Sequence, residues 1–132
     1  MATLDDLRRI AADLPGTVVA DDGQFAISVP VKGKLKGFVW AWAERVDPRK
    51  ARVINESVVA IVVPSLSAKE VIVASLGEAA VEDPHYRGYP AVLVRLALIS
   101  GEDLEDLVID AWRCKAPKDL LVSYDTLEVF AD

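Results

Sequence analysis

A short aromatic turn around residue 85 carries most of the side chains with which this chain could perform acid–base chemistry. His85 is the only histidine of the sequence, and a tyrosine and an arginine follow it directly. Histidine has the unperturbed pKa closest to neutrality, which makes it the first candidate for a general acid or base. That role needs partner groups, and Asp83 and Tyr86 lie too close in sequence to form a site alone. We therefore expect His85 to stabilise the turn, with ligand contact as the alternative and catalysis as the least favoured role.

Signatures of the common catalytic and cofactor sites are absent from the sequence. It has no glycine-rich phosphate loop, no zinc-ligand spacing and no GxSxG nucleophile elbow. The single cysteine, Cys114, lies at the end of an expected helix, where the negative end of the helix dipole disfavours a thiolate. We predict a packed, unreactive thiol there, and we predict no catalytic residue, no cofactor and no metal.

Arg95 interrupts an otherwise apolar strand and therefore needs a partner. A charge in such a place is costly unless it is paired or reaches a groove at the sheet edge. We predict an ion pair with the acidic last helix, for example with Glu105 or Asp110, and keep contact with an anion or ligand as the alternative. His85, Tyr86 and Arg95 together form a candidate ligand cleft, and an enzyme would have to use these same three residues.

Positive charge is concentrated between residues 32 and 52. The whole chain has a net charge of −6, which argues against unspecific binding to a polyanion. This stretch, however, has seven basic residues against two acidic ones, and its local charge of +5 leaves −11 for the rest. By itself this asymmetry is expected of solvated surface loops, with a polyanionic partner as the alternative. The residues expected to contact DNA phosphates are Lys32, Lys34, Lys36, Arg49, Lys50 and Arg52.

Three segments of the chain have the signals of helices. Each begins with a serine or threonine that is followed three residues later by an acidic residue, the spacing of a helix N-cap. The capping pairs are Thr3 with Asp6, Ser67 with Glu70, and Ser100 with Asp103. The expected helices end at Pro15, Gly77 and Pro117. Apolar spacing after residue 119 is too irregular for a prediction.

Six stretches between these helices predict strands, because their apolar residues alternate or are continuous. They are residues 17–20, 24–29, 37–43, 58–63, 79–83 and 91–99. Residues 30–37 are interpreted as a hairpin loop with alternating lysines, and 45–55 as an excursion from the sheet. The sequence thus predicts one domain, 1–132, with an α+β fold of two layers, a largely antiparallel sheet, and the order helix, four strands, helix, two strands, helix.

The large aromatic residues are expected in the core. Phe38, Trp40 and Trp42 alternate along one expected strand and should share one buried face. Trp112 lies on the apolar stripe of the last helix. Stacking of these tryptophans on nucleic-acid bases is the alternative.

Membrane insertion and export are not indicated. The longest purely apolar runs, 38–43 and 58–63, have six residues each, whereas a bilayer span needs about twenty. No basic flank followed by an apolar run opens the chain, and one cysteine excludes an intramolecular disulfide. We expect a cytoplasmic protein without a membrane partner.

The aromatic turn and the last helix also resemble a known family. Residues 84–96 (PHYRGYPAVLVRL), 110–113 (DAWR) and 116–118 (APK), with 7–10 (LRRI), 14–16 (LPG) and 38–40 (FVW) upstream, resemble the MmcQ/YjbR family of small bacterial proteins. The resemblance implies a two-layer fold grouped with secretion-chaperone-like and frataxin-like topologies, and DNA binding through a "double wing" of hairpins. It implies no catalytic residue or cofactor. We therefore expect a non-enzymatic module that binds duplex DNA; a chaperone-like or adaptor role towards a protein partner is the alternative, and a small-molecule binder or an enzyme using His85 is less favoured.

Overall fold

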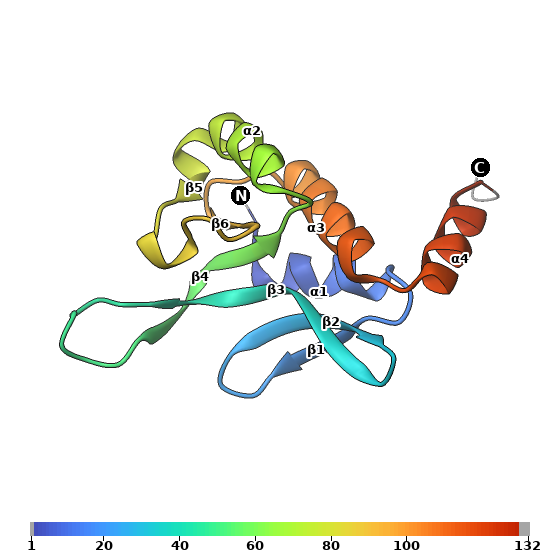
Figure 1. Cartoon of the computed structure of the whole chain (residues 1–132), viewed down its shortest axis with the longest axis horizontal. Helices are drawn as coiled ribbons and strands as arrows, with labels where there is room; N and C mark the ends of the chain where they lie inside the picture. Colours follow the sequence, from blue (N-terminus) through green and yellow to red (C-terminus); the bar gives the residue numbers. More distant parts are fainter. Residues whose placement is uncertain (1, 130–132) are drawn as a thin grey trace.

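The fold is a six-stranded antiparallel sheet with helices packed against one face (Figure 1). The computed structural model describes residues 2–129. The elements are α1 (Leu4–Ala12), β1 (Val18–Asp21), β2 (Phe25–Val31), β3 (Lys34–Glu44), β4 (Val53–Val62), α2 (Leu66–Leu76), the 3-10 helix η1 (Gly77–Ala79), β5 (Ala80–Val81), the 3-10 helix η2 (Pro84–Tyr86), β6 (Ala91–Arg95), α3 (Gly101–Lys115) and α4 (Lys118–Val129). The strand order is β1-β2-β3-β4-β6-β5, with every neighbouring pair antiparallel. The predicted α+β class is confirmed; α4 occupies the tail that the sequence left open.

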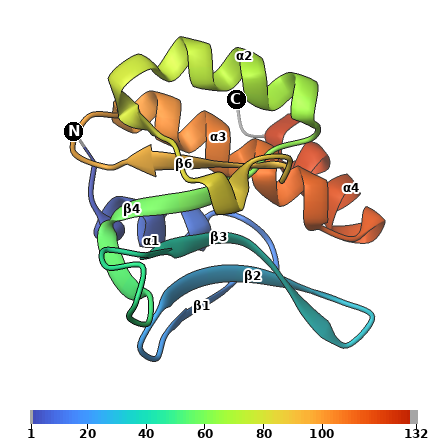
Figure 2. The ribbon, with the colours of Figure 1, turned by 60° about the vertical axis from the view of Figure 1, so that its left-hand side comes forward.

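The main core lies between the sheet and the helices α1 and α3. Apolar residues of both helices, among them Leu7, Leu104 and Trp112, are fully buried against β2, β3, β4 and β6. Helix α2 lies beside α3 near the β6 edge, so it covers the end of this layer (Figure 2). The burial of Trp112 on the inner stripe of α3 is as predicted, because that helix has a clear apolar face.

Two of the three predicted helix starts are confirmed. The Thr3 hydroxyl accepts a hydrogen bond from the amide of Asp6, and Ser100 caps α3 in the same way through Asp103. The predicted capping pair of Ser67 and Glu70 is wrong. Ser65 is the N-cap of α2, because its extended backbone (φ −161°, ψ 169°) is the one that an N-cap requires. Helix α2 therefore begins at Leu66 and includes Lys69.

A β-bulge in β3 overturns the expectation that Phe38, Trp40 and Trp42 share one face. Gly37 and Val39 pair with consecutive residues of β2, which leaves Phe38 as an extra residue between them. Phe38 and Val39 therefore both point into the main core, and the alternation continues with the opposite phase. Trp40 and Trp42 lie on the face turned away from α3, where Trp42 belongs to a second, smaller buried cluster.

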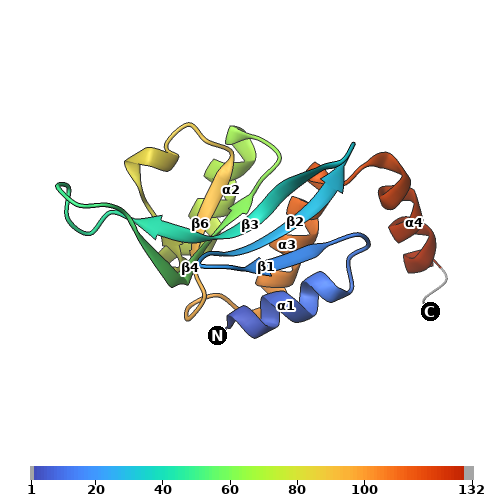
Figure 3. The same ribbon diagram turned by 90° about the horizontal axis from the view of Figure 1, so that it is seen from below.

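Both basic segments are β-hairpins: the hairpin predicted at 30–37 is confirmed with a shorter turn, whereas the excursion predicted at 45–55 is a second hairpin of the sheet. Strand β2 continues to Val31 and β3 begins at Lys34, so only Lys32 and Gly33 form the turn. Both have positive φ (52° and 80°), as a two-residue type I′ turn requires. At the other end, β3 reaches Glu44 and β4 begins at 53, so β4 starts five residues before the predicted strand. The β2–β3 and β3–β4 hairpins, called the basic hairpins below, project at opposite ends of β3 (Figure 3).

No helix within residues 2–129 is both long enough and apolar enough to cross a membrane.

Candidate functional site

The β2–β3 hairpin presents three exposed lysines. Lys34 and Lys36 pair with Val31 and Val29, so these two lysines lie on one face of the strand. Lys32 occupies the turn itself. Within the described residues, none of the three ammonium groups makes a hydrogen bond or an ion pair, and all three residues are exposed.

The β3–β4 hairpin has a loop, residues 45–52, that is held by its own side chains. The Arg45 guanidinium donates to the carbonyl oxygens of Pro48 and Lys50 (3.5 and 2.9 Å), and the Asp47 carboxylate accepts from the amide of Arg49 at 3.0 Å. The Arg49 side chain is 90% exposed and lies 3.6 Å from Asp47, and the Lys50 side chain is exposed. The loop is thus braced from inside while two cations project outward.

Arg52 differs from the other predicted DNA contacts. Its guanidinium donates to the Ala43 carbonyl at 2.8 Å and lies 3.4 Å from the Asp83 carboxylate. Only 26% of its side chain is exposed. Arg52 therefore joins the base of the β3–β4 hairpin to residues 83–90, called the aromatic turn below.

Asp83 holds the aromatic turn in place. Its carboxylate accepts hydrogen bonds from the amide of His85 and from the indole nitrogen of Trp42, both at 2.9 Å, besides the contact with Arg52. Burial by itself would raise the pKa of Asp83, but these three donors outweigh it and leave the pKa below its usual value. The negative charge of Asp83 is thus stabilised by donors within the folded protein.

Tyr86 packs on the face of the sheet turned away from α3. Its hydroxyl accepts a hydrogen bond from the Trp40 indole nitrogen at 2.9 Å, and its ring lies 6.0 Å from that of Tyr89. It also contacts the small cluster that contains Leu93. His85 is exposed and stands edge-on to the Tyr86 ring, 5.8 Å away. The bulge at Phe38 makes this arrangement possible, because it turns Trp40 towards the aromatic turn.

Arg95 does not form the predicted ion pair with Glu105 or Asp110 of α3, so that prediction is wrong. Its guanidinium donates to the carbonyl oxygens of Glu78 and Ala80, at 2.8 and 3.1 Å. The reason is the register of the sheet: Arg95 pairs with Val58, whose side chain belongs to the cluster on the far face from α3.

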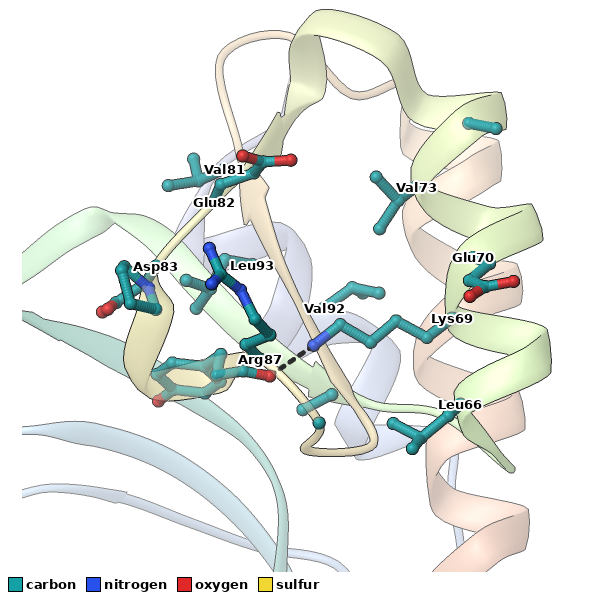
Figure 4. Close-up of a pocket in the computed structure, with 15 residues that line it drawn as sticks. Leu66, Lys69, Glu70, Val73, Val81, Glu82, Asp83, Arg87, Val92 and Leu93 are labelled. Atoms are coloured by element: carbon teal, nitrogen blue, oxygen red, sulfur yellow. Dashed lines mark hydrogen bonds between the residues drawn. The ribbon is translucent and has the colours of Figure 1, made fainter.

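A groove, which the sequence did not indicate, lies between α2 and the aromatic turn (Figure 4). It has a volume of about 780 Å³, and Tyr86 lines it, whereas His85 and Arg95 do not. The three residues of the predicted cleft are therefore not brought to one cavity. The polar residue that crosses the groove is Lys69, whose ammonium donates to the carbonyl oxygens of Tyr86 and Tyr89 at 2.6 and 2.9 Å.

Lys69 was missed because the sequence places it in a capping motif rather than inside a helix. The signal was present, since Lys69 is the only basic residue in an apolar stretch from Leu66 to Leu76. Burial lowers the pKa of its ammonium group. Lys69 and Val73, which lies one helical turn later on the same side of α2, both line the groove.

Neither Cys114 nor a metal-binding cluster provides a further candidate site among the described residues. Cys114 is exposed rather than packed, contrary to the prediction, because it lies off the inner stripe of α3. Partial burial of the sulfur and the Asp110 carboxylate raise the pKa of the thiol, which agrees with the expected low reactivity. Among residues 2–129, no three histidine, cysteine or carboxylate side chains come together as metal ligands would.

Comparison with known proteins identifies relatives over almost the whole chain. No family model matches it. The uncharacterized proteins Rv2570 of Mycobacterium tuberculosis (strain H37Rv) and Mb2600 of Mycobacterium bovis are each 34% identical over 130 residues, covering 94% of this chain and 96% of theirs. A crystal structure of the Deinococcus radiodurans protein DR2400, described with the domain DUF419, is similar with a TM-score of 0.60 and 19% identity, over 85% of this chain and 77% of that one. DUF419 is the MmcQ/YjbR-type family, so this likeness shows the fold that the resemblance implied.

Proposed function

The chain belongs to the family of these mycobacterial proteins, and we propose that it is a non-enzymatic DNA-binding module of the MmcQ/YjbR type that holds duplex DNA with its two basic hairpins. The proposal requires a cytoplasmic protein, as expected from the sequence. It rests on five hairpin cations that project into solvent. They are Lys32, Lys34, Lys36, Arg49 and Lys50.

The spacing of the hairpins supports a duplex as the ligand. Both hairpins belong to β3, which has 11 residues, and they lie at its two ends. A strand of that length spans roughly 33 Å, which is close to the ~34 Å of one turn of B-DNA. A duplex of this repeat lying along β3 would therefore reach both hairpins.

Much of the negative charge is concentrated on a helix rather than on the basic hairpins. Helix α3 carries five acidic residues on its outer surface against two basic ones at its end. The acidic residues are Glu102, Asp103, Glu105, Asp106 and Asp110. A polyanion is repelled by this side and attracted by the hairpins, so the net charge of −6 does not prevent a directed approach.

Titration of a labelled 20-base-pair duplex by fluorescence anisotropy, at about 50 and about 200 mM salt, tests the proposal. Five phosphate contacts predict an affinity that falls roughly 500-fold between these salt concentrations. Replacing Lys32, Lys34 and Lys36 with alanine should lower the slope of log affinity against log salt by about three. The matched control is the triple alanine variant of Arg9, Lys115 and Lys118, which removes the same charge from the helix layer. No binding at low salt, or equal loss in both triple variants, would contradict the proposal.

A protein partner remains the second candidate, and one surface favours it. The sheet face turned away from α3 exposes Val18, Leu35 and Tyr89, with 40%, 59% and 43% of their surface in solvent. Exposed apolar side chains on one face are typical of interaction surfaces. Binding through this face would depend little on salt and would survive the triple lysine variant, whereas Leu35→Glu would abolish it.

A further inference from the structure

The groove between α2 and the aromatic turn is a second site, remote from the hairpin tips. We propose that it binds a small organic carboxylate with an apolar body, and that Lys69 and Arg87 bind the carboxylate group. This site does not depend on DNA binding, and it would stand if the hairpins bound a different partner.

The size and lining of the groove suit a small molecule. Its volume of about 780 Å³ falls within the roughly 300–1,000 Å³ of ordinary ligand pockets. The walls and floor between the charged residues are apolar, with Val73 from α2, Val81 from β5, and Val92 and Leu93 from β6. Figure 4 shows Val73 and Lys69 pointing from α2 towards the space above β6. The groove therefore offers apolar surface against which the apolar part of a small ligand can pack.

Within residues 2–129, no carboxylate forms an ion pair with the ammonium group of Lys69. Its ammonium group bonds two carbonyl oxygens, those of Tyr86 and Tyr89, and an ammonium has three N–H donors. One donor is therefore left for a ligand. Burial lowers the pKa of this group, so the charged form lacks part of the stabilisation that water would give. A carboxylate beside it would supply both a counter-charge and the missing acceptor.

Arg87 is the second cation, and it is free to act. Its amide donates to the Pro84 carbonyl, but within residues 2–129 its guanidinium makes no hydrogen bond or ion pair. In Figure 4 the Arg87 side chain extends over the groove on the side of the aromatic turn, opposite α2. A guanidinium can bind both oxygens of a carboxylate at once, so it matches the group that Lys69 would stabilise.

Among the described residues, no acidic side chain of the groove forms an ion pair with Lys69 or Arg87. The Asp83 carboxylate is turned to Trp42 and Arg52. Glu82 lies at the β5 end of the groove, and Glu70 lies on the outer side of α2, beyond Lys69 (Figure 4). The anionic end of a ligand is therefore placed by the two cations, and its apolar body lies along Val73.

Titration of the 15N-labelled full chain with octanoate, followed by amide chemical shifts, tests the site. Octanoate should shift amides of α2, the aromatic turn and β6, whereas octylamine, with the same chain and the opposite charge, should bind at least about tenfold more weakly. Arg87→Gln should weaken octanoate binding about tenfold without changing the melting temperature, because the Arg87 side chain has no partner among residues 2–129. Lys118→Gln, on exposed α4, is the matched control and should bind octanoate normally.

A second variant keeps the test independent of the polar residues. Ala74 lines the groove from the exposed side of α2, so Ala74→Leu fills space and keeps a good helix former. It should reduce octanoate affinity and leave DNA affinity as in the wild type. Equal binding of octanoate and octylamine, the absence of shifts at the groove, or normal octanoate binding by Arg87→Gln would each overturn the proposal.

Discussion

The basic hairpins and the aromatic turn are both rich in charged and aromatic side chains, but the two regions use them differently. In the aromatic turn, Asp83 has three donors and Tyr86 accepts from an indole. At the hairpin tips, Lys32 and Lys50 are exposed and have no side-chain partner among the described residues. The comparison teaches that a charge with internal partners supports the fold, whereas a charge without them is free to bind.

Arg52 connects the two regions and shows why sequence position alone misleads. It belongs to the basic stretch, yet its guanidinium contacts Ala43 and Asp83. We therefore expect it to behave as a residue of the aromatic turn. The predictions below test this division, beginning with the largest expected change in stability.

Replacing Tyr86 with alanine should lower the free energy of unfolding by about 2–4 kcal/mol. The ring contacts the cluster around Leu93 and Tyr89, and its removal also leaves the indole N–H of Trp40 without its acceptor. Tyr86→Phe keeps the ring and should cost about 1 kcal/mol. Urea unfolding measures both changes; wild-type stability of the alanine variant would show that the turn does not support the fold.

Asp83→Asn should lower stability by about 1.5–3 kcal/mol at neutral pH, because charge-assisted hydrogen bonds are lost. The pKa of Asp83 is depressed in the folded protein, so its contribution is complete above the unfolded carboxyl pKa of about 3.9 and is lost as the pH falls through the lower folded value. The wild type should thus lose stability more steeply than the variant as the pH falls below about 4. Thermal denaturation across this pH range measures the difference, and parallel curves would contradict the assignment.

Arg52→Ala and Arg49→Ala compare, within one hairpin, a cation that stabilises the fold with a cation that is proposed to bind DNA. Arg52→Ala should cost about 1 kcal/mol of stability, because it removes partly buried hydrogen bonds. Arg49→Ala should change stability by no more than about 0.5 kcal/mol while weakening DNA binding, since its side chain is exposed. Urea unfolding measures stability and fluorescence anisotropy measures DNA binding. A loss of stability in Arg49→Ala and not in Arg52→Ala would contradict these assignments.

The smallest expected effect is a gain in stability. Lys32 has a left-handed backbone (φ 52°), which asparagine tolerates better than lysine. Lys32→Asn should therefore raise stability by about 0.5 kcal/mol and remove one phosphate contact. A melting temperature above the wild type with a lower salt slope would confirm both parts, and a destabilised variant would show that the turn has another constraint.

Much of the fold could be predicted, because its signals are local. The capping pairs at Thr3 and Ser100 fix where two helices begin, and the apolar stripe of α3 places Trp112 in the core. The site could be predicted only in part. The cations between residues 32 and 52 are visible in the sequence, but their position at the two ends of one strand depends on strand pairing.

Sequence by itself therefore determined the fold class, the order of the helices and strands up to α3, and the stretch that carries the positive charge, since each depends on residues a few positions apart. Tertiary structure alone decided which face each side chain occupies and which charges remain free. One extra residue at Phe38 reverses the faces of Trp40 and Trp42, because side chains alternate with a period of two along a strand. Lys69 and Arg95 find carbonyl oxygens 15 or more residues away, at positions set by the packing of α2 and by the sheet register rather than by neighbouring residues.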